Sequence, residues 1–317
     1  MKNIIRSSRH VSKSIILSCI ILLYIFIIHI VSLYASVFAS VTPTLWSTEG
    51  EWIAFSCSTT DENGFGSNIY LVRPDGTQIT KLTDDNSAAL SPIWSPDGEW
   101  LLYVDKSRIF RVSSDGTQLD EMVDKLVIEG LQSAVISPSG DKLVFVVSYT
   151  HSSSIAIYDI LSESYSTLTT INGSISSIDW YSDSERLAFS VISANRGPII
   201  YNISIYSRNY EQLFSEIGIF RGLDISASSL LTYAILWNRS TTLFTIDLET
   251  NERLRLYDIP NAYSPSWSPD SSEIAFAGNS SEYSNGIYRL EANGAVTNVI
   301  GLLDCYPSSP QWFSYDL

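Results

Sequence analysis

The sequence is poor in the side chains that enzymes most often use for catalysis. It contains three histidines and three cysteines, and of these only His151, Cys57 and Cys305 lie beyond residue 40. A Ser–His–Asp triad would have to use His151, and the Gly-x-Ser-x-Gly turn that exposes a nucleophilic serine does not occur. A zinc site usually draws on several His or Cys ligands. The sequence therefore predicts neither kind of active site, and His151 is expected to be a solvated loop residue.

Basic residues are also scarce. The chain carries 19 Lys and Arg against 34 Asp and Glu, a net charge of −15. Residues 41–317 carry a net charge of −19, because residues 1–40 hold four basic residues and no acidic one. A domain this acidic repels phosphate backbones, so no nucleic-acid partner is expected. The charge would suit a cationic partner or divalent ions, and solubility of an exported protein explains it equally well.

No cofactor motif is found in the sequence. The run from Asp61 to Gly66 is similar to a calcium-binding loop, but it places Phe65 and Val72 where oxygen ligands are required. We therefore expect no cofactor, and bound calcium has no motif to support it.

One long hydrophobic run occurs, near the N-terminus. Residues 14–34 are 21 residues without a formal charge, and four basic residues precede them. The length favours a membrane-spanning helix, whereas the small residues around Ala39 offer a site for signal peptidase. We predict a retained anchor in residues 1–40, with a cleaved signal peptide as the alternative. In both cases the basic residues stay in the cytoplasm and residues 41–317 are exported.

One short unit recurs through residues 41–317. In the stretch 92–103, two β-prone runs flank a Ser-Pro-Asp-Gly turn, which is typical of a β-hairpin. Equivalent hairpins are anchored at residues 46, 94, 136, 180, 225, 267 and 312, spaced 42 to 48 residues apart. A period in the low forties that holds four short strands is typical of a propeller blade. We predict an all-β fold, a six-bladed propeller of four-stranded antiparallel blades preceded by one hydrophobic helix.

The repeat resembles that of the TolB-like β-propeller family, which is related to the WD repeat. The pattern is Trp-Ser-Pro-Asp-Gly followed by Ile-Ala-Phe, Ile-Tyr and a closing Leu-Thr, and it covers residues 43–313. The resemblance implies the propeller fold but no single activity, because propellers host many unrelated functions. The blades begin soon after residue 41, without room for the α/β domain that precedes the propeller in TolB. A role in the Tol system is therefore not expected.

A propeller gathers the connections between successive blades around one mouth of its central channel. Here these connections mix carboxylates, amides and aromatic side chains, as a binding face does and as ordinary polar loops also do. No catalytic or metal-ligating residue is predicted. The candidate channel-mouth binding residues are Asp84, Asp85, Asn86, Gln132, Asn172, Arg221, Asn261, Tyr263 and Tyr306.

Two segments compete for the innermost strand of the first blade, one around Trp46 and one around Trp312. We expect the C-terminal segment to take this place and close the ring. The hairpin register then puts residue 306 opposite Cys57, one residue from Cys305. Since disulfides persist outside the cytoplasm, a Cys57–Cys305 bond is one outcome, and two free thiols are the other.

These observations favour a non-catalytic scaffold that binds a protein or small ligand at the cell envelope. We expect it to be a monomer tethered to the membrane by its N-terminal helix. The alternative is an enzyme, a hydrolase or lyase with a cation-dependent site at the channel mouth. Such a site would need carboxylates from several blades that face the channel.

The apolar run leads to a first test. The full chain should fractionate with membranes, because a run of about 20 apolar residues is long enough to cross the bilayer. Mass spectrometry of the protein should find the N-terminal segment still attached. A mature N-terminus at Ser40 would contradict the anchor and favour a cleaved signal peptide.

Overall fold

The structure is a computed structural model that describes residues 50–61, 64–83, 88–122, 128–193, 196–278, 285–301 and 305–314. The chain divides into two units, Met1–Thr48 and Glu49–Leu317. The expected N-terminal helix and the segment around Trp46 belong to the first unit, which lies outside the described residues. Within the described ranges every regular element is a β-strand. No helix long and apolar enough to cross a membrane is found in these ranges.

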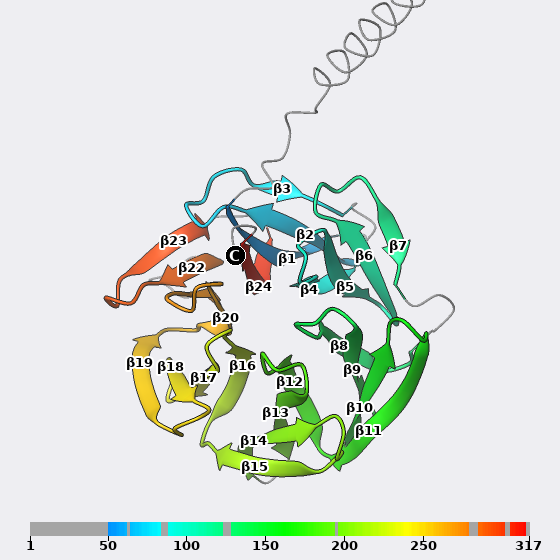
Figure 1. Ribbon diagram of the computed structural model, residues 1–317. Coiled ribbons are helices and arrows are strands. Elements are labelled where there is room, and N and C mark those ends of the chain that lie inside the picture. Colours follow the sequence, from blue (N-terminus) through cyan, green and yellow to red (C-terminus); the bar gives the residue numbers. More distant parts are fainter. Residues whose placement is uncertain are drawn as a thin grey trace, which may run out of the picture. The chain divides into compact units, whose positions relative to one another are not determined.

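The second unit is a ring of six four-stranded antiparallel sheets (Figure 1). Blade 1 holds β24 (Tyr306–Ser314), β1 (Glu51–Asp61), β2 (Gly64–Val72) and β3 (Thr80–Lys81), from the centre of the ring outward. Blade 2 holds β4 (Ala89–Trp94), β5 (Trp100–Asp105), β6 (Arg108–Ser113) and β7 (Leu119–Glu121). Blade 3 holds β8 (Leu131–Ile136), β9 (Lys142–Ser148), β10 (Ser152–Asp159) and β11 (Ser164–Asn172).

The remaining blades follow the same order from the centre outward. Blade 4 holds β12 (Ser174–Trp180), β13 (Arg186–Ser193), β14 (Arg196–Ser204) and β15 (Tyr210–Ser215). Blade 5 holds β16 (Ile219–Ile225), β17 (Leu230–Trp237), β18 (Ser240–Asp247) and β19 (Arg253–Ile259). Blade 6 holds β20 (Tyr263–Trp267), β21 (Ile274–Gly278), β22 (Gly286–Leu290) and β23 (Val296–Gly301). The predicted six blades of four antiparallel strands are confirmed.

The hairpin turn of the repeat is held by its own side chains. Ser95 Oγ donates to Asp97 Oδ1 at 2.5 Å and accepts the backbone N–H of Trp100 at 3.0 Å. Gly98 has φ 71°, a conformation that glycine adopts without steric cost. The turn therefore closes without help from other blades, which explains why its residues recur along the chain.

Aromatic residues of the repeat form a stacked pair in the core of five of the six blades; in blade 3, Phe145 lies opposite Ala156 instead. The phenylalanine or tyrosine of the second strand stacks on the aromatic residue opposite it in the third strand, with ring centroids 5.3 to 5.7 Å apart. Such cross-strand pairs stabilise a sheet beyond the area they bury. The pairs are Phe55–Tyr70, Tyr103–Phe110, Phe189–Tyr201, Tyr233–Phe244 and Phe276–Tyr288.

The ring closes through the C-terminal strand, as predicted. β24 pairs antiparallel with β1 and places Trp312 opposite Ile53. The residue opposite Cys57 is Pro307 rather than residue 306. The expected register would place Trp312 opposite Glu51, but it pairs with Ile53, in the same register as the hairpin pair Trp94–Leu101. The bulge between Ala54 and Ser56 takes back one of these two residues.

A disulfide joins the first described strand to the start of the closing strand. Cys57 of β1 is bonded to Cys305, which immediately precedes β24, and the two Cα atoms are 5.5 Å apart. Cys57 packs in a hydrophobic cluster that joins blade 1 to blade 6. The bond therefore lies at the seam where the two ends of the ring meet.

Loss of this bond should destabilise the ring. It spans a sequence separation of 248 residues, so the chain-entropy model gives a cost of about 5 kcal/mol when it is removed. Denaturant titrations of the wild type and of a Cys57→Ser/Cys305→Ser variant measure the change in the free energy of unfolding. Cys19→Ser serves as the control and should leave the stability unchanged. If Cys57 and Cys305 both react with a thiol reagent in the unfolded, unreduced protein, the bond does not form.

Candidate functional site

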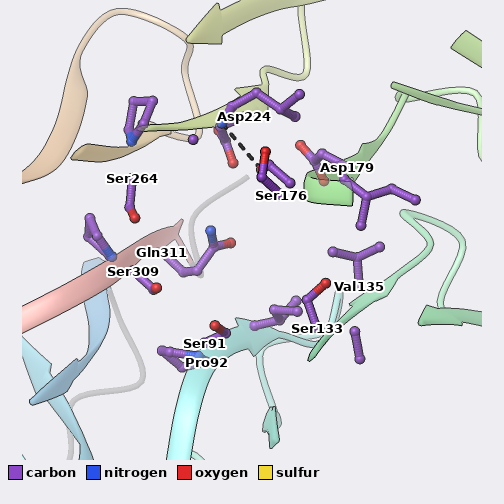
Figure 2. A pocket seen from close by; sticks show the side chains of 18 of the residues that line it. Ser91, Pro92, Ser133, Val135, Ser176, Asp179, Asp224, Ser264, Ser309 and Gln311 are labelled. Atoms are coloured by element: carbon purple, nitrogen blue, oxygen red, sulfur yellow. Dashed lines mark hydrogen bonds between the residues drawn. The ribbon is translucent and has the colours of Figure 1, made fainter. Parts of the chain in front are cut away.

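The innermost strands of the six blades surround a cavity of about 240 Å³ (Figure 2). Its lining residues come from β4, β8, β12, β16, β20 and β24. Each strand contributes a short stretch, so residues roughly one blade apart in the sequence meet here. The chemistry of the cavity is therefore assembled by ring closure.

Every inner strand carries a β-bulge at the level of the cavity. A bulge bends the strand and re-aims a side chain. In blades 1, 2 and 6 it contains a serine with positive φ before a proline: Ser309 (φ 50°), Ser91 (φ 52°) and Ser264 (φ 49°). Positive φ is strained for a residue other than glycine, and such strain persists only where the surroundings hold it. Figure 2 shows these serines around the cavity.

Asp179 and Asp224 are acidic residues of the cavity lining, and they lie on adjacent inner strands. Asp179 Oδ2 accepts the backbone N–H of Ile225 in the next blade at 2.7 Å. Asp224 Oδ2 accepts the backbone N–H of Trp267 in the blade after that at 2.8 Å. Each carboxylate therefore fastens its blade to the following one, while its remaining surface faces the cavity.

Neutral groups fasten other seams between blades. The hydroxyl of Ser266 accepts the backbone N–H of Trp312 at 3.3 Å. The indole N–H of Trp94 donates to the backbone carbonyl of Gln311 at 3.2 Å. The tryptophans of the repeat thus hold neighbouring blades together as well as filling space.

The protein environment makes both aspartates harder to ionise. Burial raises the pKa of Asp179 to about 7, against the opposing effect of the backbone N–H groups that its carboxylate accepts. Burial also raises the pKa of Asp224 well above its usual range, and the nearby Asp179 carboxylate adds to this. Like charges that share a region of low dielectric raise each other's pKa. The pair therefore retains a proton under conditions where a solvated aspartate is fully ionised.

One of the predicted mouth residues lines the cavity, and a second lies beside it. Arg221 of β16 lines it, and Tyr263 of β20 directly precedes the lining residue Ser264. Burial raises the pKa of Tyr263, and the positive charge of Arg221 partly offsets this, so the two side chains are near one another. The hydroxyl of Tyr263 donates to the backbone carbonyl of Pro307 at 2.9 Å, and this bond fixes the orientation of the tyrosine side chain.

The other predicted mouth residues do not line the cavity. Gln132 accepts a hydrogen bond from Ser148 Oγ at 2.6 Å, and Asn172 lines a separate groove. Asn261 is exposed in a turn, and Tyr306 is exposed at the start of β24. Gln132 and Arg221 lie within strands, in the bulges where the inner strand has no paired residue, and Tyr306 pairs with Ser58. Asp84, Asp85 and Asn86 lie outside the described residues.

Asp179 and Asp224 are missing from the residues predicted above, although the repeat contains a signal for them. The position just before each hairpin anchor belongs to the inner strand at the channel. Its occupants are Ile93, Val135, Asp179, Asp224, Ser266 and Gln311. Aligning the repeats at this one position would have shown two acidic residues in consecutive blades. Among the described residues, no three His, Cys, Asp or Glu side chains come together as a metal site would require.

Sequence comparisons match short parts of this chain only. No family model matches it. An uncharacterized protein from Agrobacterium fabrum is 33% identical over 106 residues, which are 32% of this chain and 34% of that protein. The uncharacterized peptidase YuxL from Bacillus subtilis is 36% identical over 61 residues, 19% of this chain and 9% of that protein. The chain thus matches about a third of the length of one curated relative and about a tenth of the other.

Solved structures match most of the chain. TolB from Acinetobacter baumannii superposes with a TM-score of 0.70 at 19% identity, over 82% of this chain and 66% of that one. The propeller resembles that of TolB. A nidogen/laminin complex matches with a TM-score of 0.69 at 10% identity, over 84% of this chain and 100% of that one. An oligogalacturonate lyase in complex with manganese matches with a TM-score of 0.56 at 16% identity, over 74% and 72%. At these identities the likeness concerns the fold alone.

The buried aspartates should make stability depend on pH. Unfolded aspartate ionises near pH 4, whereas Asp179 holds its proton up to about pH 7, so the unfolded state binds fewer protons between these values. The free energy of unfolding should therefore fall as pH rises through this window. Denaturant titrations at several pH values should show a flatter profile for Asp179→Asn, by on the order of 1–3 kcal/mol across the window.

Asp247→Asn is the matched control. The backbone N–H groups of Thr250 and Glu249 lower the pKa of this turn aspartate, so it titrates below the window. Its profile should have the same slope as the wild type between about pH 4 and 7. An unchanged slope in Asp179→Asn as well would show that Asp179 carries no such penalty.

Proposed function

We propose that the chain is an exported, membrane-tethered scaffold that binds a protein partner through the mouth of its propeller, without catalysis of its own. The fold it shares with TolB is compatible with this role, and one neighbour of the same fold belongs to a complex of two proteins, nidogen and laminin. The Cys57–Cys305 disulfide supports export, because such bonds persist in oxidising compartments. The scaffold acts as a monomer at the cell envelope.

The observation that carries this proposal is an apolar patch beside the mouth. Ile217 and Ile219, at the start of blade 5, have exposed fractions of 71% and 56%, and Trp237 has 56%. Ile219 pairs with Leu236, the neighbour of Trp237, and directly precedes the cavity-lining residues at the start of β16. Large exposed apolar side chains in one place mark interaction surfaces, and tryptophan is among the residues that contribute most to binding energy.

The charge beside the patch indicates what the partner should offer. Arg221 is exposed and lines the cavity two residues after Ile219. An arginine next to an apolar patch suits a partner segment that carries a carboxylate beside apolar side chains. Small ligands could use the same mouth, but the patch extends beyond the cavity and favours a protein.

The alternative is a cation-dependent hydrolase or lyase at the channel mouth. The specific observation in its favour is the pair of carboxylates, Asp179 and Asp224, that faces the cavity. The fold also matches a lyase crystallised with manganese. Esterase, glycosidase, phosphatase and lyase substrates can be screened with and without calcium or manganese. Turnover that Asp179→Asn or Asp84→Ala abolishes would favour the enzyme over the scaffold.

Affinity capture tests the scaffold directly. Tagged full-length protein, expressed in its source cells and extracted in mild detergent, should retain a partner that is identified by mass spectrometry. Trp237→Ala and Arg221→Glu should each reduce the retained amount by about tenfold, because each removes about 1.4 kcal/mol of binding energy. Tyr206→Ala, which truncates an exposed tyrosine in the turn between β14 and β15, is the control. A capture profile that neither mouth substitution alters would contradict the proposed binding face.

A further inference from the structure

A second concave site lies between blades 3 and 4, outside the central cavity. It is a groove of about 360 Å³, within the range of roughly 300–1,000 Å³ typical of small-molecule pockets. It shares no lining residue with the cavity. Its walls are the turn from Tyr149 to Ser152, the connection from Asn172 to Ser174, and Ile192.

The floor of this groove is held rigidly. The backbone N–H of Gly173 donates to the carbonyl of His151 at 3.1 Å. The buried hydroxyl of Ser153 donates to the carbonyl of Gly173 at 3.1 Å and accepts the N–H of Ile175 at 3.2 Å. Gly173 has φ +127°, and a Cβ there would lie 2.9 Å from Val191 Cγ1, so only glycine fits. The connection between the blades is therefore fixed before any ligand arrives.

The rim, in contrast, presents side chains that the fold does not use. The hydroxyl of Tyr149, the imidazole of His151 and the amide of Asn172 form no hydrogen bond with another described residue. Tyr149 has an exposed fraction of 59%, so its ring is available as a flat apolar surface. A preorganised floor with unpaired polar groups above it lowers the entropic cost of binding.

The kinds of side chain define the ligand. A side-chain amide offers two hydrogen-bond donors and one acceptor, and a neutral imidazole offers one donor and one acceptor. This combination suits a compound that carries neighbouring hydroxyl groups. An exposed aromatic ring packs against the C–H face of a sugar ring. No lining residue is Lys, Arg, Asp or Glu, so nothing here compensates a charged ligand.

We propose that this groove binds a neutral saccharide, with the Tyr149 ring as stacking platform and the Asn172 amide and His151 imidazole as hydrogen-bonding groups. The open rim suits one or two sugar units of a longer chain rather than an enclosed monosaccharide. The site is independent of the protein-binding mouth, and either function can be absent without affecting the other.

Titration calorimetry of the full-length protein tests this with cellotriose, maltotriose and chitotriose, and with trigalacturonate as an acidic probe. At least one neutral trisaccharide should bind, and trigalacturonate should bind more weakly. Tyr149→Ala and Asn172→Ala should each weaken binding by about tenfold, corresponding to the loss of one stacking or bidentate contact. Tyr149→Phe keeps the ring and should lose less affinity than Tyr149→Ala.

Two controls separate a lost contact from a damaged fold. Tyr206→Ala truncates an exposed tyrosine in the turn between β14 and β15, and Asp247→Asn alters a turn in blade 5, so both should bind as the wild type does. Circular dichroism should show the same thermal transition for the Tyr149 variants and the wild type. The proposal is overturned if no neutral trisaccharide binds at millimolar concentration, if only trigalacturonate binds, or if Tyr149→Ala and Asn172→Ala leave the affinity unchanged.

Discussion

The pairing of β24 with β1 is the contact on which the rest of the ring depends. Each blade has apolar surface that only its two neighbours can cover, so an open chain of blades would leave both ends exposed. Supplying the innermost strand of blade 1 from the C-terminus removes those ends. Trp312 then enters the same hydrophobic cluster as Ile53 and the disulfide-bonded Cys57. The closure is held by backbone pairing, apolar packing and a covalent bond together.

Ring closure also determines the chemistry at the centre. The inner strands approach one another closely, so their backbone N–H groups need acceptors from the neighbouring blade. The side chains that accept them are those of Asp179, Asp224 and Ser266. Two of these three groups are carboxylates in a place that disfavours their ionisation. The cavity therefore combines a structural role with acidic side chains that a ligand could reach, and for that reason the enzyme alternative depends on experiment.

The two binding sites we propose share a construction. At the mouth and in the groove, strands held by backbone hydrogen bonds present side chains that the fold itself does not need, such as Trp237 and Tyr149. Propellers differ in function through such residues, since the blade core is filled in the same way in each. The matching solved structures keep the fold at identities of only 19% and 10%.

The sequence by itself determined the number of blades, their four-stranded makeup and the strand that closes the ring. Turn residues and alternating apolar residues act over a few positions, so their pattern is legible in a repeat such as 92–103. Only the tertiary structure decided that Asp179 and Asp224 share a cavity, that Arg221 lies near Tyr263, and that Tyr149 and Asn172 line one groove. These contacts join residues that lie 20 to 50 positions apart, and bulges in the inner strands change which side chains face inward. A local pattern cannot encode that, because the direction of each side chain depends on how neighbouring blades pack.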